Sequence, residues 1–154
     1  MKGDPEIIEV LNSVLTAELT AINQYFIHSK MCADWGYKKI ADKKRAESIE
    51  EMKHADVVID RILLLDGTPN MQRLNPVRVG EDVPEQHKLD LDVEYDARKR
   101  LNDGISLCHE RRDNGTRELL EAILREEEEG IDWLEAQLHI IAEIGKERYL
   151  AEQL

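Results

Sequence analysis

Four glutamates and one histidine interrupt helical repeats that are otherwise apolar. They are Glu18, Glu51, His54, Glu94 and Glu127. His54 follows Glu51 by three residues, so both side chains should lie on one face of a helix. A buried carboxylate without a partner costs several kcal/mol, and a marginally stable domain cannot absorb that cost four times. A pair of divalent or trivalent cations, held by hard oxygen ligands and an imidazole, would neutralise such a cluster.

Each of these signals is weak when taken alone. Glutamate is common in this sequence, so Glu51-x-x-His54 can arise by chance, and a single Glu in an apolar stripe can also mark a solvated helix face. Coincidences near the middle of four separate helices are much rarer. Di-iron carboxylate bundles take one Glu from each of two helices and a Glu-x-x-His from each of the others. The constellation therefore predicts a two-metal site at the centre of a bundle.

Helix caps, prolines and glycines delimit the helices that must position these residues. Asp4-Pro5-Glu6 predicts a helix start, and Asp34-Trp35-Gly36 predicts a short break. Asp82, with Glu85 three residues later, resembles a capping box. The expected segments are a helix from 5 to the break at 34–36, a helix over about 38–65, a loop over about 66–82, a helix from 82 to a turn at 113–115, a helix from about 116 to 145, and a short helix within 146–154. This order predicts an all-α four-helix bundle with one long crossover loop and a short fifth helix at the C-terminus.

Length and composition favour one helical domain over residues 1–154. The residues are 42% hydrophobic and 35% charged, a balance that is typical of long helices. The formal net charge of −12 disfavours nucleic acid and anionic membranes as partners. No apolar run is long enough to span a membrane, and the first residues lack a secretion signal. Because Cys32 and Cys108 form no Cys-x-x-Cys pair, we expect a cytoplasmic protein with reduced thiols.

At the candidate ligands the sequence resembles the bacterioferritin family. Three segments carry the resemblance: ELTAINQYF at 18–26, ESIEEMKHAD at 47–56 and IDWLE at 131–135. The second segment is highly specific, and the similarity extends over nearly the whole chain. The resemblance implies a ferritin-like bundle, a cage of twenty-four subunits that stores ferric mineral, a di-iron ferroxidase centre in each subunit, and haem between paired subunits.

The resemblance also implies a role for each candidate ligand. Glu51 and Glu127 would bridge the two irons, Glu18 and His54 would hold one iron, and Glu94 would hold the other. The family has a further histidine ligand at the position that Gly130 occupies here. Water, an altered helix turn, or Glu129 swung inward are the candidates for filling the space. We therefore expect a ferroxidase whose activity is impaired.

Met52 would be the axial ligand of haem b, paired with the Met52 of a two-fold partner. The haem would transfer electrons for iron release, with a small redox partner such as a ferredoxin. Family members can carry a His and an Asp at positions 46 and 50 as an iron site on the cavity surface. Because this chain has Ala46 and Glu50, that site should be weakened.

The sequence thus predicts an iron storage subunit that oxidises ferrous iron with dioxygen or peroxide in a homo-oligomeric cage. One alternative is a haem-binding, ferroxidase-deficient structural subunit that assembles with a second, active ferritin-type subunit. Gly130 favours that alternative, and the five retained ligands oppose it. Another alternative is a small di-iron oxidase or peroxide scavenger that forms no cage. Met52 and the tail helix, which a lone bundle would not need, oppose this one.

Overall fold

Five helices make up the chain, and no strand is present. The computed structural model describes all residues from 1 to 154. The helices are α1 (Pro5–Asp34), α2 (Lys38–Leu64), α3 (Val83–Glu110), α4 (Asn114–Ile144) and α5 (Lys146–Ala151). This arrangement confirms the expected all-α bundle with a long crossover and a short fifth helix. No helix is both long and apolar enough to cross a membrane.

Side-chain caps set three of the helix starts. The Asp4 carboxylate accepts a hydrogen bond from the backbone N–H of Glu6 at the start of α1. Asp82 accepts one from the N–H of Glu85 at the start of α3. The turn between α3 and α4 differs from the expectation, because α4 begins two residues earlier, at Asn114. Asp113 caps it, and the chain reverses at Arg112, whose φ is 58°.

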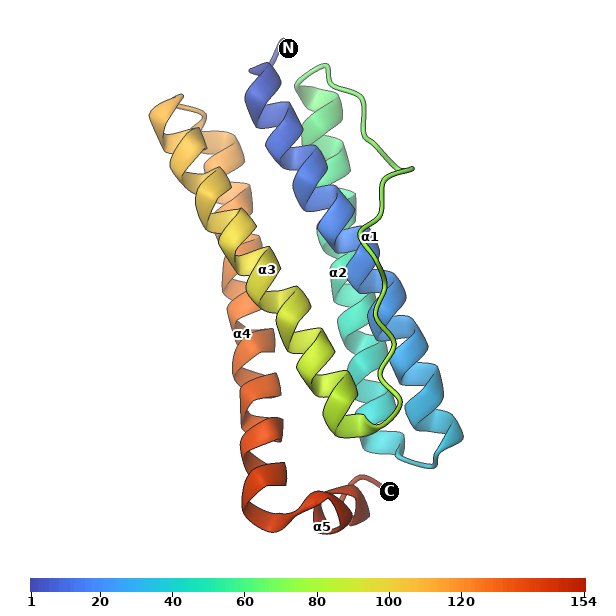
Figure 1. Cartoon of the computed structure of the whole chain (residues 1–154). Helices are drawn as coiled ribbons and strands as arrows, with labels where there is room; N and C mark the ends of the chain where they lie inside the picture. Colours follow the sequence, from blue (N-terminus) through green and yellow to red (C-terminus); the bar gives the residue numbers. More distant parts are fainter.

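The helices form two antiparallel hairpins, α1 with α2 and α3 with α4, which pack side by side (Figure 1). The crossover loop runs the length of the bundle along α1, so α3 starts at the end of the bundle where α1 and α2 are joined. The short helix α5 turns across that same end. The N-terminus lies at the opposite end.

A ladder of polar side chains on α1 holds the crossover loop. Asn12 accepts from the N–H of Asn70 at 2.8 Å, Thr20 from that of Asn75 at 3.0 Å, Gln24 from that of Arg78 at 3.1 Å and His28 from that of Gly80 at 3.0 Å. The α1 residues stand at intervals of four or eight, so they line one face of the helix. Four of the loop's backbone donors are thereby paired although the loop has no regular structure.

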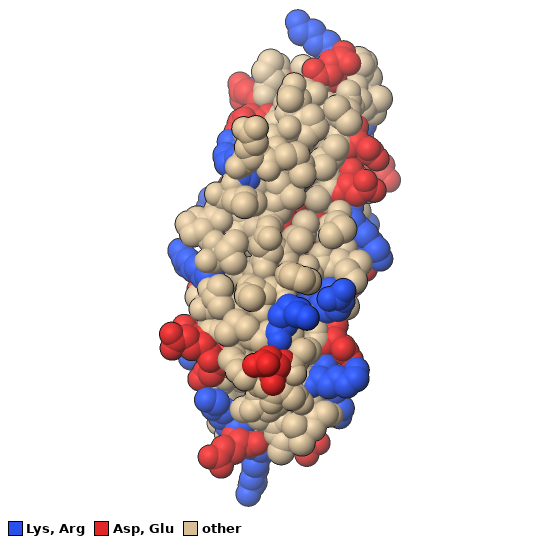
Figure 2. Space-filling view, turned by 90° about the vertical axis from the view of Figure 1, so that its right-hand side faces the viewer, with Lys and Arg blue, Asp and Glu red and all other residues tan.

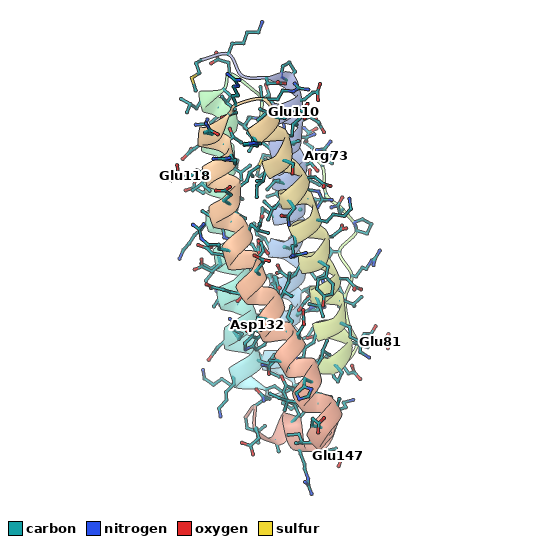
Figure 3. All side chains as sticks on the ribbon, turned by 90° about the vertical axis from the view of Figure 1, so that its left-hand side faces the viewer. Arg73, Glu81, Glu110, Glu118, Asp132 and Glu147 are labelled. Atoms are coloured by element: carbon teal, nitrogen blue, oxygen red, sulfur yellow. The ribbon has the colours of Figure 1, made fainter.

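The apolar core is divided by the polar centre of the bundle. The largest cluster lies toward the end of the bundle that holds the N-terminus and the α3–α4 turn, and it includes Leu11, Val58, Leu101 and Leu120. A smaller cluster at the other end contains Tyr149 of α5 together with residues of α1, α2 and α3. Charged side chains lie on the outer surfaces of α3, as at Glu110, and of α4, as at Glu118 and Asp132 (Figure 3). The glutamates of the sequence pattern fall between these apolar clusters.

Candidate metal centre

Four of the predicted ligands converge inside the bundle from three helices. Glu18 comes from α1, Glu51 and His54 from α2, and Glu127 from α4, and one ligand atom of each lies within 4.8 Å of the others. All four side chains are buried. Since the four ligands are spread over three helices, only the packed bundle brings them together.

The two ring nitrogens of His54 have different surroundings. Nδ1 faces the cluster and lies 3.2 Å from a Glu127 oxygen, 3.4 Å from Glu51 and 3.6 Å from Glu18. Nε2 points the other way and contacts the Glu126 carboxylate. The nitrogen that a metal would need is therefore the one directed at the carboxylates.

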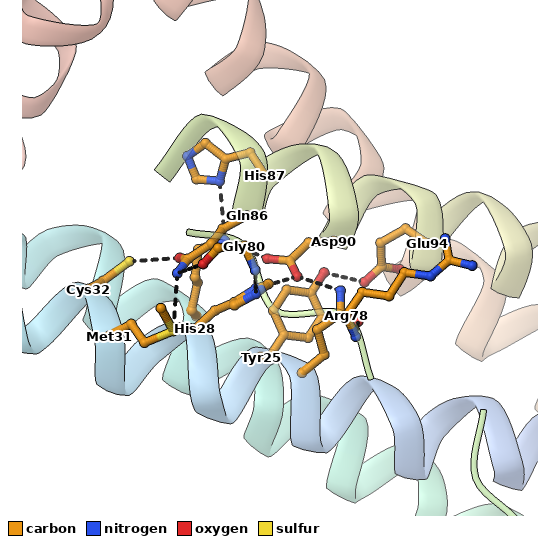
Figure 4. Close-up of polar contacts among 12 residues, drawn as sticks. Tyr25, His28, Met31, Cys32, Arg78, Gly80, Gln86, His87, Asp90 and Glu94 are labelled. Atoms are coloured by element: carbon orange, nitrogen blue, oxygen red, sulfur yellow. Dashed lines mark hydrogen bonds and ion pairs between the residues drawn. The ribbon is translucent and has the colours of Figure 1, made fainter. Parts of the chain in front are cut away.

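Glu94 of α3 lies on the other side of Glu127. The Tyr25 hydroxyl donates a hydrogen bond of 2.5 Å to Glu94 Oε1 (Figure 4). Gly130 is buried opposite Glu94, and a Cβ built on it would lie 3.7 Å from the Glu94 carboxyl carbon. A Cβ at position 130 would therefore face the carboxylate of the candidate second metal position, at an ordinary contact distance.

Burial raises the pKa of every carboxyl group in the cluster, as it does for any charge moved away from water. The groups are those of Glu18, Glu51, Glu94 and Glu127. The Glu127 charge raises the pKa of Glu94 further. Burial by itself lowers the pKa of His54, but its hydrogen bonds to Glu127, Glu18 and Glu51 outweigh burial and raise that pKa well above the usual value. The raised pKa values therefore mean that the surroundings favour proton binding at these groups.

Three buried carboxylate oxygens in the cluster have no hydrogen-bond partner. They are Glu18 Oε2, Glu94 Oε2 and Glu127 Oε1. Unpaired oxygens are rare in folded proteins because each keeps its desolvation penalty. Hard divalent cations prefer carboxylate oxygens, and imidazole is a ligand for iron. The donor set is therefore suited to iron.

The remaining predicted residues have distinct places. Glu129 is exposed on α4 and is not among the grouped ligand atoms, so the structure does not bring it to the space at Gly130. Met52 is 57% exposed and lies outside the bundle. Tyr25 and Glu126 also contact the cluster, although no sequence pattern marks either as a site residue, beyond the place of Tyr25 in the apolar stripe of the first helix.

One helical turn before Glu94, a buried ion pair sits among polar side chains (Figure 4). Lys44 Nζ lies 2.5 Å from Asp90 Oδ2, and neither side chain is exposed. His28 Nδ1 and Gln24 Nε2 both donate to the other Asp90 oxygen. On the far side, Lys44 also donates to His87, which in turn contacts the Tyr149 hydroxyl of α5. The network thus connects α1, α2, α3 and α5 next to the cluster.

Comparison with known proteins identifies the family. A model of the ferritin-like domain matches residues 8–144. A bacterioferritin of Mycobacterium leprae is 50% identical over 152 residues, which cover 99% of this chain and 96% of the relative. One of Streptomyces coelicolor is 52% identical over 98% of this chain and 90% of its own, and one of Brucella melitensis is 46% identical over 97% and 92%. Both the matched domain and these full-length similarities agree with the helical bundle and its carboxylate cluster, and the chain belongs to the bacterioferritins of the ferritin-like family.

Proposed function

We propose that this protein is an iron storage subunit that takes up ferrous iron at the buried cluster and oxidises it there. The observation that carries the proposal is the convergence of three buried carboxylates, those of Glu18, Glu51 and Glu127, on His54, together with three buried carboxylate oxygens at the site that lack any hydrogen bond. In this proposal residues 1–154 act as one ferritin-like domain.

Each side chain has a part in binding two ferrous ions. Glu51 and Glu127 are the residues to share between the ions, and Glu18 and His54 complete the first position. Glu94, oriented by the Tyr25 hydroxyl, serves the second position. A cation that bound there would compete with protons for His54 and the carboxyl groups, whose pKa values are raised.

The redox balance requires an external oxidant. Two ferrous ions lose one electron each, and a dioxygen molecule accepts both with two protons to give hydrogen peroxide. If hydrogen peroxide is the oxidant, the same two electrons and two protons give two water molecules. The buried cluster keeps the two ions close enough together for a two-electron step.

Gly130 makes the two positions unequal. The first position has an imidazole, whereas the second has only carboxylate oxygens and is open toward position 130. We expect the second ion to be held weakly, which lowers the oxidation rate without abolishing it.

Met52 and its surroundings suit a haem ligand. The thioether is 57% exposed, and Phe26 and Ile49 are also exposed, at 48% and 46%. Figure 2 shows a broad tract without charged side chains on the side of the molecule that carries the crossover loop in Figure 1. Two copies paired through Met52 would bury apolar side chains that otherwise face water. Haem b bound between them would supply an electron-transfer centre for iron release.

Assembly and cellular context complete the proposal. We expect twenty-four copies, built from such dimers, to form the cage that holds the mineral, and a small redox protein such as a ferredoxin to deliver electrons. Cys32 and Cys108 are buried and unpaired, which agrees with a reducing compartment such as the cytoplasm.

A second candidate function follows from Gly130. The chain would then be a haem-binding structural subunit that relies on an active ferritin-type subunit for oxidation. Only the missing ligand favours this reading, whereas the remaining cluster is intact.

Aerobic addition of ferrous iron to the purified homo-oligomer distinguishes the iron-oxidising subunit from the structural subunit. The absorbance of ferric iron should rise faster than in buffer, and a Glu51→Ala variant should lose that excess. A parent protein that oxidises iron no faster than buffer would support the structural subunit. Sedimentation of the same sample tests the cage, and a stable monomer with and without iron would contradict it.

A further inference from the structure

Glu126 and Glu127 are adjacent on α4 and contact opposite sides of one imidazole. Glu127 faces Nδ1 of His54 from inside the cluster, at 3.2 Å. Glu126 accepts a hydrogen bond from Nε2, on the side of the ring away from the other cluster carboxylates. Because Glu127 is buried and Glu126 is 53% exposed, the imidazole lies at the boundary between the cluster and solvent.

A neutral histidine has one ring nitrogen with a free lone pair, and it binds a metal through that nitrogen. The hydrogen bond made by the other nitrogen decides which one is free and how the ring is turned. A carboxylate in that role fixes the N–H on its own side and makes the opposite nitrogen a stronger donor to the metal.

We propose that Glu126 is a positioning residue that holds the His54 proton on Nε2 and keeps Nδ1 directed at the metal. This inference rests on the proposed function of the cluster. The role has special weight here because Gly130 supplies no second imidazole, so His54 is the one nitrogen donor among the grouped ligands.

The surroundings of Nε2 contain one further acidic group. A carboxylate oxygen of Glu50 on α2, one of Glu126 and a ring nitrogen of His54 all lie within 4.8 Å of one another. No hydrogen bond joins Glu50 to His54, and Glu50 pairs instead with Lys53 at 2.9 Å. Glu126 is therefore the carboxylate that orients the ring.

The test measures cobalt(II) binding to the assembled protein, since cobalt(II) is stable in air and its visible absorption depends on its ligands. The part of the absorption that disappears in His54→Ala defines the site. Glu126→Ala should weaken cobalt binding there about 10-fold, the lower end for loss of such a partner. Glu126→Gln should weaken cobalt binding much less, because the amide oxygen can still accept a hydrogen bond from Nε2–H of His54.

The matched control is Glu118→Gln, which removes the same charge from an exposed position on α4 and should leave cobalt affinity unchanged (Figure 3). The thermal midpoint of the metal-free protein should be the same in the parent and in both Glu126 variants, which separates positioning from a structural role. Unchanged cobalt affinity in Glu126→Ala overturns the inference. An equal loss in Glu50→Gln also overturns it and favours a cation held between Glu50 and Glu126. If His54→Ala leaves the cobalt spectrum unaltered, the proposed centre itself is wrong.

Discussion

Gly130→His should rebuild the second metal position. A Cβ at residue 130 would lie 3.7 Å from Glu94 Oε1 and 3.8 Å from Oε2, which is ordinary contact distance, so the backbone need not move to admit a Cβ. The imidazole would start directly opposite the Glu94 carboxylate. Glu94 Oε2 has no hydrogen-bond partner at present, so a cation between the two groups would satisfy it.

The substitution should affect folding stability and metal affinity separately. Replacing a helical glycine gains at most about 1 kcal/mol of folding stability, which does not depend on metal. An added nitrogen ligand should tighten binding at the second position by at least about 10-fold, equivalent to about 1.4 kcal/mol. Gly130→Ala is the matched control, because it provides the helix stabilisation without a ligand.

The assay compares four proteins at equal protein and iron concentrations. They are the parent, Gly130→Ala, Gly130→His and Gly130→His with Glu51→Ala. The histidine variant should bind a second divalent metal per subunit and oxidise ferrous iron faster, the alanine variant should resemble the parent, and loss of Glu51 should remove the gain. If Gly130→His changes neither metal content nor initial rate, position 130 is not a vacant ligand position. If Gly130→Ala shows an equal gain in metal content and oxidation rate, the gain comes from stabilising the helix and not from a new ligand.

Three further outcomes are expected. Met52→Leu keeps the side-chain volume but removes the sulfur, so haem at one per two subunits should disappear from the absorption spectrum while sedimentation is unchanged; full haem with the same spectrum would contradict the assignment. Lys44→Met leaves the buried Asp90 charge without its partner, so the free energy of unfolding, measured by heat or denaturant, should fall by about 3–5 kcal/mol. Adding Asp90→Asn should restore part of that free energy. A fall of less than about 1 kcal/mol would show that the ion pair is not needed for stability. Burial opposes ionisation of Asp90, but Lys44 and His28 hold the pKa of its carboxyl group at about 2, below its ordinary value of 3.8. The parent should therefore keep about 2 kcal/mol of folding stability from this group above pH 4 and lose it as the pH falls toward 2. A free energy of unfolding that is constant over this range in the parent but not in Asp90→Asn would refute the sign.

The helices could be predicted because their boundaries are encoded locally. Asp4 and Asp82 accept hydrogen bonds from residues two or three positions ahead, which a sequence displays directly. The turn at 111–113 was misplaced because it contains no glycine, while Gly115 lies within the first turn of α4. Arg112 adopts the positive φ instead, and arginine is not a residue type that predicts this conformation.

The cluster carboxylates could also be predicted, since helical periodicity alone places a Glu among apolar residues. Their partners could not. Lys44 lies in the run Lys43-Lys44-Arg45, which has the composition of a solvated surface, yet it is completely buried against Asp90. Likewise Glu126 stands in a run of four glutamates, and only the packing of α4 against α2 distinguishes it from its neighbours. Such contacts depend on the rotation of one helix about its axis relative to another, which single-helix patterns do not contain.

The crossover loop sets the register that the metal centre requires. Gln24 and His28 on α1 each accept a hydrogen bond from the loop and each donate one to Asp90 on α3. The descending loop and the helix that follows it are thereby fixed to the same two α1 side chains. Asp90 lies one turn before Glu94, and Tyr25, between those two α1 residues, donates to Glu94. A shift of α3 by a single turn would break all of these bonds and leave the Glu94 carboxylate about 5 Å from its place in the cluster. The longest irregular segment of the chain therefore determines whether the α3 carboxylate can join those of the other helices.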